Sequence, residues 1–277
     1  LDELRYSLRS VWEHVPYARH IYIVTDGQVP PWLDTADPRI TIVEHASIFE
    51  DPSALPTFNS HAIETQLHHI DGLADHYLYL NDDVFFGRTS DWATYFERCG
   101  TSHFFPSTAL FPVGELHATD KSVDHAGRNL QLELFREFGW APRNKLIHTP
   151  HPQQRQLLIE AEQRFDDRYR ATMHARFRST GDVSFAAALH HRYAQVTGRA
   201  SVGNLAYEYL ALESDNVADH LARLRSASFD TLCLNDGEMT HQQQADVRPL
   251  LADFLNRRFP YPAPWEIDGA LRSHPST

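Results

Sequence analysis

An apolar stretch with three polar residues in its middle, residues 77–87, constrains the fold of this chain more than any other segment. Apolar side chains lead up to Asn81, Asp82 and Asp83 and resume directly after them. A buried strand that ends before Asn81 places the amide and both carboxylates at its carboxyl edge, where open α/β sheets bind ligands. Because adjacent carboxylates are costly to bury without a positive partner, we expect a cation here.

A hard divalent ion suits this pair, because Mg²⁺ and Mn²⁺ prefer oxygen ligands and keep coordination positions for substrate phosphates. Asp82 and Asp83 are therefore candidate metal ligands, and Asn81 is a candidate substrate contact. The alternative is a turn between two hairpin strands, since the sequence Asn-Asp is common in turns.

Polar residues also follow other predicted strands. The apolar run 21–25 ends at Asp26, and a second Leu-Asn-Asp sequence adds Asn235 and Asp236. If these strands end on the same side of one sheet, their carboxylates share one cleft. The alternative for the second sequence is a turn, because Asn-Asp-Gly is strong turn chemistry.

The order of predicted elements favours an α/β fold with a largely parallel, Rossmann-like sheet flanked by helices, as in nucleotide-sugar transferases. Apolar spacing predicts helices over about residues 4–15, 60–73, 217–224 and 242–257, and strands over 21–25, 40–43, 77–80, 207–212 and 229–234. We expect a single catalytic domain over residues 1–277. Within it, residues 1–100 bind the nucleotide sugar and the helix-rich residues 101–277 complete the site.

Composition excludes several classes of protein. A net charge of −12 argues against a general nucleic-acid-binding surface, and no apolar run approaches the roughly 20 residues of a membrane helix. Cys99 and Cys233 form neither a disulfide framework nor a CxxC pair. The chain also lacks a dinucleotide fingerprint, a P-loop and a GxSxG nucleophile elbow.

Two histidines flank a proline in the segment 148–151. Proline restricts the residue before it, so His148 and His151 lie on a rigid extended segment, and a positioned histidine is the usual general base near neutral pH. The alternative is a surface loop with incidental histidines, since the chain has 18 of them. A zincin-type site is disfavoured, because Pro150 prevents helical i, i+4 pairing.

Arg178 lies just before a predicted helix that Asp182 caps. Backbone N–H groups at a helix start, with an arginine beside them, form an anion site. The alternative is a surface arginine paired with Asp182.

Several blocks, taken together and in order, resemble the Stealth proteins, the hexose-1-phosphate transferases of bacterial capsule synthesis that are related to the animal lysosomal-enzyme N-acetylglucosamine-1-phosphotransferase. Residues 3–10, 21–28, 31–33 and 79–87 resemble the second conserved block, residues 148–151 and 177–182 the third, and residues 233–236 the fourth. The first block, a strand with a Thr-Trp pair and an acidic residue, has no counterpart, and the chain does not begin with Met. We therefore expect either that an amino-terminal part has been trimmed away or that the nucleotide site is incomplete.

The resemblance implies transfer of a sugar 1-phosphate from a nucleotide-diphosphate sugar to an acceptor sugar hydroxyl, with release of a nucleoside monophosphate. It implies Mg²⁺ or Mn²⁺ as the cofactor. The implied metal ligands are Asp82, Asp83 and Asp236. The implied catalytic residues are His151, His148, Arg178 and Asp83, and the implied substrate contacts are Arg5, Arg9, Asp26, Asn81, Asp182 and Asn235.

Two other functions compete with this one. An ordinary metal-dependent glycosyltransferase releases a nucleoside diphosphate instead, and a non-catalytic sugar-binding domain releases nothing. The expected partners are a nucleotide-sugar donor and a glycan acceptor, with no nucleic acid and no integral membrane segment. We expect a cytoplasmic chain and leave open both peripheral association with the inner membrane face and homo-oligomerisation.

Overall fold

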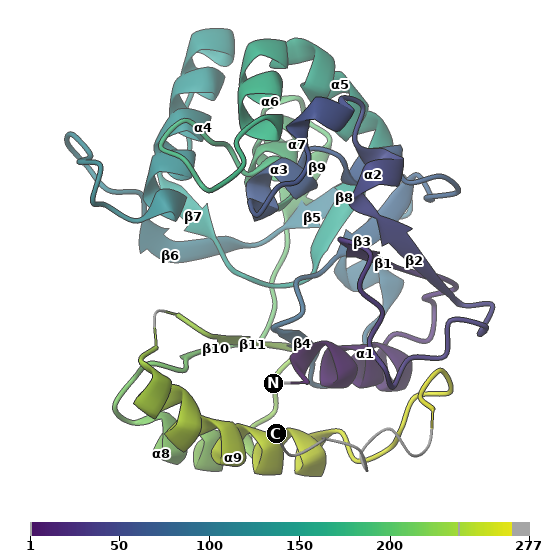
Figure 1. Ribbon diagram of the computed structural model, residues 1–277. Coiled ribbons are helices and arrows are strands. Elements are labelled where there is room, and N and C mark those ends of the chain that lie inside the picture. Colours follow the sequence, from purple (N-terminus) through teal and green to yellow (C-terminus); the bar gives the residue numbers. More distant parts are fainter. Residues whose placement is uncertain (1, 238, 268–277) are drawn as a thin grey trace. The chain divides into compact units, whose positions relative to one another are not determined.

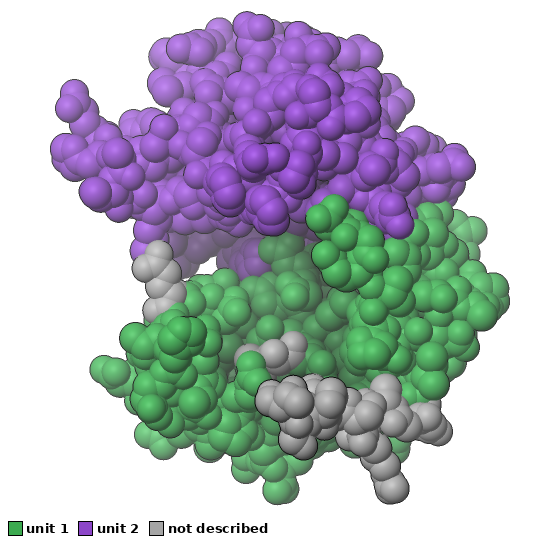
Figure 2. Space-filling model, viewed as in Figure 1, with its two compact units in different colours: residues 1–42, 80–92, 205–277 green, residues 43–79, 93–204 purple. Residues whose placement is uncertain are grey.

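The computed structural model describes residues 2–237 and 239–267 and divides the chain into two compact units (Figures 1 and 2). The first unit contains residues 1–42, 80–92 and 205–277, and the second contains residues 43–79 and 93–204. Both units are therefore discontinuous in sequence. This division differs from the expected boundary near residue 100, because the chain passes from one unit to the other four times.

The first unit is built around a three-stranded sheet. Its elements are α1 (Glu3–His14), β1 (Ile21–Thr25), β2 (Ile40–Glu44, which ends in the second unit), β4 (Val84–Phe86), β10 (Tyr207–Ala211), α8 (Val217–Leu224), β11 (Thr231–Asn235) and α9 (His241–Arg258). The strand order is β10-β11-β4, with β10 parallel and β4 antiparallel to the central β11. Strands β1 and β2 form a separate pair.

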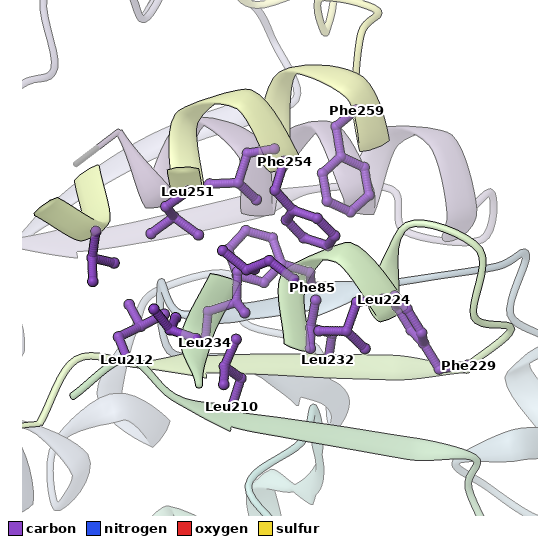
Figure 3. Packing of buried hydrophobic residues seen from close by; sticks show 14 residues of the cluster. Phe85, Leu210, Leu212, Leu224, Phe229, Leu232, Leu234, Leu251, Phe254 and Phe259 are labelled. Atoms are coloured by element: carbon purple, nitrogen blue, oxygen red, sulfur yellow. The ribbon is translucent and has the colours of Figure 1, made fainter. Parts of the chain in front are cut away.

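Helices α8 and α9 pack on this sheet and form the main core of the first unit (Figure 3). In α8, Val217, Leu221 and Leu224 recur at helical spacing and are buried, so one face of the helix is apolar. They pack with Phe85 of β4 and Phe254 of α9 in one cluster. The apolar side of the sheet is thereby covered, and the polar residues gather at its edge.

The second unit contains short strands and most of the helices. Its elements are α2 (His45–Ile48), η1 (Pro52–Ala54), α3 (Ser60–Glu64), η2 (Leu67–His69), β3 (His76–Tyr79), β5 (Ser102–Phe104), β6 (Pro106–Leu110), α4 (Ser122–Phe138), β7 (Asn144–Leu146), β8 (His151–Gln154), α5 (Arg155–Arg164), α6 (Asp166–Met173), the π-helical η4 (Phe185–Leu189), α7 (His190–Val196) and β9 (Ala200–Val202), and η3 (Trp92–Thr94) lies at its boundary. The strand pairs are β3–β8 and β6–β7, both antiparallel, and β5–β9, which is parallel. Throughout residues 2–237 and 239–267, no helix combines the length and the apolar character that crossing a membrane requires.

The α/β class is confirmed, but the expected single, largely parallel sheet is not found. The described strands form five small sheets with parallel and antiparallel pairs. The described strands are only three to five residues long, and several pair with a partner far away in sequence, as β4 does with β11 and β3 with β8. Strand propensity depends on such distant neighbours, so apolar periodicity finds the strands without finding their partners.

Candidate functional site

Carboxylates gather at one edge of the β10-β11-β4 sheet. Ala211 of β10 lies beside Asn235 of β11, so both strands end at this edge, where Asp236 follows. The antiparallel β4 begins here, directly after Asp82 and Asp83. The backbone continues the pairing, because the Leu234 N–H donates to the Asp83 carbonyl at 3.0 Å. The antiparallel geometry thus brings the two Leu-Asn-Asp sequences together.

Helix α1 brings a further carboxylate to this edge. Its Ser7 hydroxyl donates to the Val84 carbonyl at 2.7 Å, and its Ser10 hydroxyl accepts from the Phe86 N–H at 3.0 Å. These small side chains let the helix lie along β4, running in the same direction as the strand. Glu3 lies one turn before Ser7 on the same face, which directs it toward the residues that precede β4.

The electrostatics agree with a cluster of negative charge. Burial, followed by the negative charges of Asp236, Asp82 and Asp83, raises the pKa of Glu3 to about 7. Limited hydration and the charge of Asp83 raise the pKa of Asp82, although that side chain is exposed at the surface. The Oε1 atom of Glu3 is buried and has no hydrogen-bond partner among the described residues. A cation would relieve this repulsion.

Asp83 is also held by polar groups from β11. The Cys233 thiol and the Asn235 amide each donate to Asp83 Oδ2, both at 3.4 Å. Burial, with Asp83 beside it, raises the pKa of Cys233, so the thiol stays protonated and acts as a donor. The oxygen-rich donor set of this edge fits Mg²⁺ or Mn²⁺ better than a thiophilic metal.

The expected geometry of this edge needs one correction. Asp82 and Asp83 lie at the beginning of the antiparallel β4 and not at the end of a parallel strand, because the preceding strand β3 belongs to a sheet of the second unit. Asn81 lies in the turn before β4, where its carbonyl accepts from the Val84 N–H at 3.3 Å. Asp26 is exposed after β1, in a different sheet from the cluster.

Arg5 and Arg9, candidate phosphate contacts, are already paired within the first unit. Arg5 Nε lies 2.5 Å from Glu266 Oε2, and Arg9 Nε lies 2.6 Å from Glu266 Oε1. The Glu266 side chain is only 2% exposed. These guanidinium groups therefore contribute to the structure of the first unit, and the substrate-binding role expected of them stays a prediction.

In the second unit, His151 is buried inside a group of aromatic and imidazole rings. Its ring stacks on Tyr79 at 6.1 Å between centroids, and its Nδ1 lies 3.1 Å from His191 Nε2. Burial, followed by the nearby His148 and His190, lowers the pKa of His151 to about 3, so its ring is neutral. A neutral, buried ring does not shield a phosphate as a cation. His148 is only partly buried and lies 6.2 Å from His151 between ring centroids.

Arg178 lies on an exposed loop of the second unit. Its Nη2 donates to Ser60 Oγ at 2.6 Å, at the start of α3. The neighbouring Phe177 is 63% exposed and stacks on Phe58 at 5.4 Å between ring centroids. An exposed cation beside an aromatic face is suited to an anionic ligand that carries a ring.

Asp182 is fully buried and anchors this loop. Its Oδ2 accepts from the Asn59 amide at 2.8 Å and from the Ser179 N–H at 2.9 Å, and its Oδ1 accepts from the Ser179 hydroxyl at 2.7 Å. Burial alone would raise the pKa of Asp182, but the nearby His61 ring and the hydrogen bonds from Ser179 and Asn59 outweigh it and hold the pKa below its ordinary value. Asp182 therefore positions the loop that carries Arg178.

Replacing Asp182 with asparagine is expected to lower the free energy of unfolding by about 2–3 kcal/mol at pH 7. The hydrogen-bond donors of Asn59 and Ser179 would then face a neutral amide in place of a buried carboxylate. A carboxyl whose pKa is lowered on folding stabilises above the unfolded pKa of about 4 and loses that effect as the pH falls through the folded pKa. Urea unfolding of wild type and variant should therefore converge below about pH 4. Asp166→Asn, an exposed substitution on α6, is the control. A constant difference from pH 7 to pH 3 would contradict the assignment.

Sequence reasoning missed three residues near the carboxylate edge. Glu3 had no local signal, because its place depends on how α1 packs along β4. Cys233 directly precedes the second Leu-Asn-Asp sequence, and this position in the sequence could have indicated that it lies near the carboxylates. At Gly237, a Cβ would lie 2.5 Å from Glu213 Oε1, so the glycine lets the Glu213 carboxylate approach the backbone. The turn reading of Asn-Asp-Gly did not include this close contact.

Known proteins match this chain over most of its length. Residues 1–104 match the family model of Stealth protein conserved region 2, residues 147–195 match conserved region 3, and residues 222–277 match conserved region 4. These are the same three blocks that carry the resemblance in the sequence.

Named relatives agree with the family models. A protein of Streptomyces coelicolor named as an exopolysaccharide phosphotransferase is 44% identical over 268 residues, which cover 96% of this chain and 44% of the relative. The exopolysaccharide phosphotransferase CpsY of Mycobacterium tuberculosis is 40% identical over 269 residues, which cover 96% of this chain and 50% of the relative. The chain thus spans about half the length of these curated relatives.

Proposed function

Because the chain belongs to the Stealth family, we propose that it transfers a hexose 1-phosphate, such as N-acetylglucosamine 1-phosphate, from a nucleotide-diphosphate sugar to a hydroxyl of an acceptor sugar. The acceptor oxygen attacks the phosphorus next to the sugar, and the nucleoside monophosphate leaves. The C1–O bond of the sugar stays intact, so its anomeric configuration is kept. The names of the relatives support sugar phosphotransfer in general.

The observation that carries this proposal is the carboxylate cluster of the first unit. Four carboxylates from α1, the turn before β4 and the end of β11 influence one another electrostatically: Glu3, Asp82, Asp83 and Asp236. We assign Asp82, Asp83 and Asp236 to a Mg²⁺ or Mn²⁺ ion, which would neutralise the charge of the donor diphosphate when bound. Asn81 and Asn235 are assigned to the donor beside it.

Two residues of the second unit, Arg178 and His148, are candidates for binding the transferred phosphate and for accepting the proton. The exposed guanidinium of Arg178 suits equatorial phosphate oxygens, because arginine binds them through paired N–H groups. His148 is the better candidate for the acceptor's proton, since the pKa of the buried His151 is about 3. We assign His151 to holding the segment in place.

Replacing His148 with alanine is expected to lower kcat about 100-fold, in the usual range for loss of a general base. The measurement is the rate of nucleoside monophosphate release at saturating donor. His117→Ala removes an exposed imidazole of the same unit and should keep the wild-type rate. If His148→Ala retained the wild-type rate and pH profile, His148 would not be the proton acceptor.

The nucleotide released tests the reaction class. The purified chain is incubated with uridine, guanosine and cytidine diphosphate sugars, Mg²⁺ and glycan acceptors, and the nucleotide products are identified. A nucleoside monophosphate is the expected product. A nucleoside diphosphate would instead support a metal-dependent glycosyltransferase, and saturable binding without turnover would support a sugar-binding domain.

A further inference from the structure

Two adjacent histidines and a glutamate converge on one point in the second unit, outside the residues assigned to phosphotransfer. His68 and His69 belong to the short helix η2, and Glu162 belongs to α5. His68 Nε2 lies 2.6 Å from Glu162 Oε2, and His69 Nε2 lies 3.1 Å from the same oxygen. The two imidazole rings are 4.1 Å apart between centroids. One carboxylate oxygen thus faces two imidazole nitrogens.

The protons on His69 show why this triad requires a cation. Its Nδ1 lies 3.2 Å from the Ile48 carbonyl, which only accepts, so Nδ1 carries a proton. The Nε2 atom of a neutral ring then presents a lone pair to the Glu162 carboxylate. Either a second proton or a metal ion must lie at Nε2 to make this contact favourable. A ring that donates through one nitrogen to a carbonyl while the other faces a shared centre is the usual arrangement of a metal-ligating histidine.

We propose that His68 Nε2, His69 Nε2 and the Glu162 carboxylate bind a divalent transition-metal ion, with Zn²⁺ as the best match. Imidazole nitrogens and one carboxylate are typical zinc ligands, whereas Mg²⁺ prefers oxygen alone. The three ligand atoms lie within 4.8 Å of one another, and tetrahedral zinc needs them roughly 3.3 Å apart. Small side-chain rotations therefore suffice to admit the ion.

The exposure of the three side chains fits an ion that reaches the site from solvent and is held on its buried side by His68. The His68 side chain is 1% exposed, whereas those of His69 and Glu162 are 23% and 18% exposed. The open side leaves room for water as a fourth ligand. The ion would link η2 to α5, elements about ninety residues apart in sequence, and would stabilise the second unit without taking part in phosphotransfer.

Zinc titration of the metal-free chain at pH 7.5, in competition with a chromophoric chelator, tests this site. Wild type should bind one equivalent of zinc more than Glu162→Gln and His69→Gln, or bind that equivalent at least about 100-fold more tightly. His174→Gln is the matched control, because it breaks a 3.4 Å histidine–carboxylate pair with Asp51 in the same unit. It should bind zinc as wild type does.

Two further measurements test the zinc site even if one triad variant folds poorly. Zinc should raise the melting temperature of wild type and of His174→Gln, but not of either triad variant. Co²⁺ added to metal-free wild type should give the visible absorption of a tetrahedral nitrogen–oxygen site, and the triad variants should lack it. Equal zinc stoichiometry and affinity in wild type and both triad variants would overturn the proposal and show a protonated histidine–glutamate cluster instead.

Discussion

Replacing Asp83 with asparagine is expected to lower the rate of sugar-1-phosphate transfer at least about a thousandfold. The substitution removes one negative charge from the cluster that we assign to the divalent ion. Loss of several kcal/mol of charge stabilisation in the transition state corresponds to such a factor, since each 1.36 kcal/mol changes the rate tenfold. The variant keeps a side-chain oxygen that can accept from Cys233 and Asn235, so the fold should be preserved.

Initial rates of nucleoside monophosphate release, measured over a range of Mg²⁺ concentrations, check this prediction. The variant should need a much higher Mg²⁺ concentration for any residual activity. Asp219→Asn, which removes an exposed carboxylate from α8, controls for the change in net charge and should match wild type. If Asp83→Asn kept both the rate and the Mg²⁺ dependence of wild type, the metal assignment would be wrong.

Local sequence was enough to locate many of the elements around this cluster. Strand β1 has the predicted bounds, and α1, β2, β10, α8 and α9 lie within a few residues of theirs. Apolar spacing determines such elements, because each buries one face against neighbours of any identity. The acidic residues were also located correctly at a sheet edge, since two adjacent carboxylates rarely lie inside a core.

Local sequence patterns do not show which strands pair with each other when they lie far apart in the chain. The apolar stretch 77–87 reads as one feature, yet β3 pairs with β8 in one unit and β4 pairs with β11 in the other. Nothing in residues 80–83 indicates that the chain changes units there. The His68, His69 and Glu162 cluster was missed for the same reason, because its histidines and its carboxylate are about ninety residues apart in sequence.

The arginines of α1 show the same problem for residues to which the family resemblance assigns a substrate contact. Arg5 and Arg9 lie one turn apart on α1, and the resemblance to the Stealth family implies that they contact the substrate. Their partner Glu266 lies 261 and 257 residues away in sequence, so no local pattern could identify it. Arg9 also donates from Nη1 to the Phe259 carbonyl at 2.9 Å. Each nitrogen of its guanidinium group therefore has a hydrogen-bond partner in the first unit.

Replacing Glu266 with alanine is therefore expected to lower the free energy of unfolding by about 3–5 kcal/mol, because it leaves two nearly buried arginines without their counter-charge. Asp253→Ala is the matched control. It removes an exposed carboxylate that accepts from Arg257 at 2.8 Å, and it should change stability by less than about 1 kcal/mol.

Urea unfolding of wild type and both variants at pH 7 measures these differences. The result also decides between the two roles of the arginines. A structural pair predicts that Arg9→Lys lowers stability and leaves the KM for the donor unchanged, because lysine cannot reproduce the paired N–H contacts with Glu266. If Arg9→Lys instead raised the donor KM at full stability, Arg9 would bind the donor phosphates after all, and its contact with Glu266 would only orient it for that task.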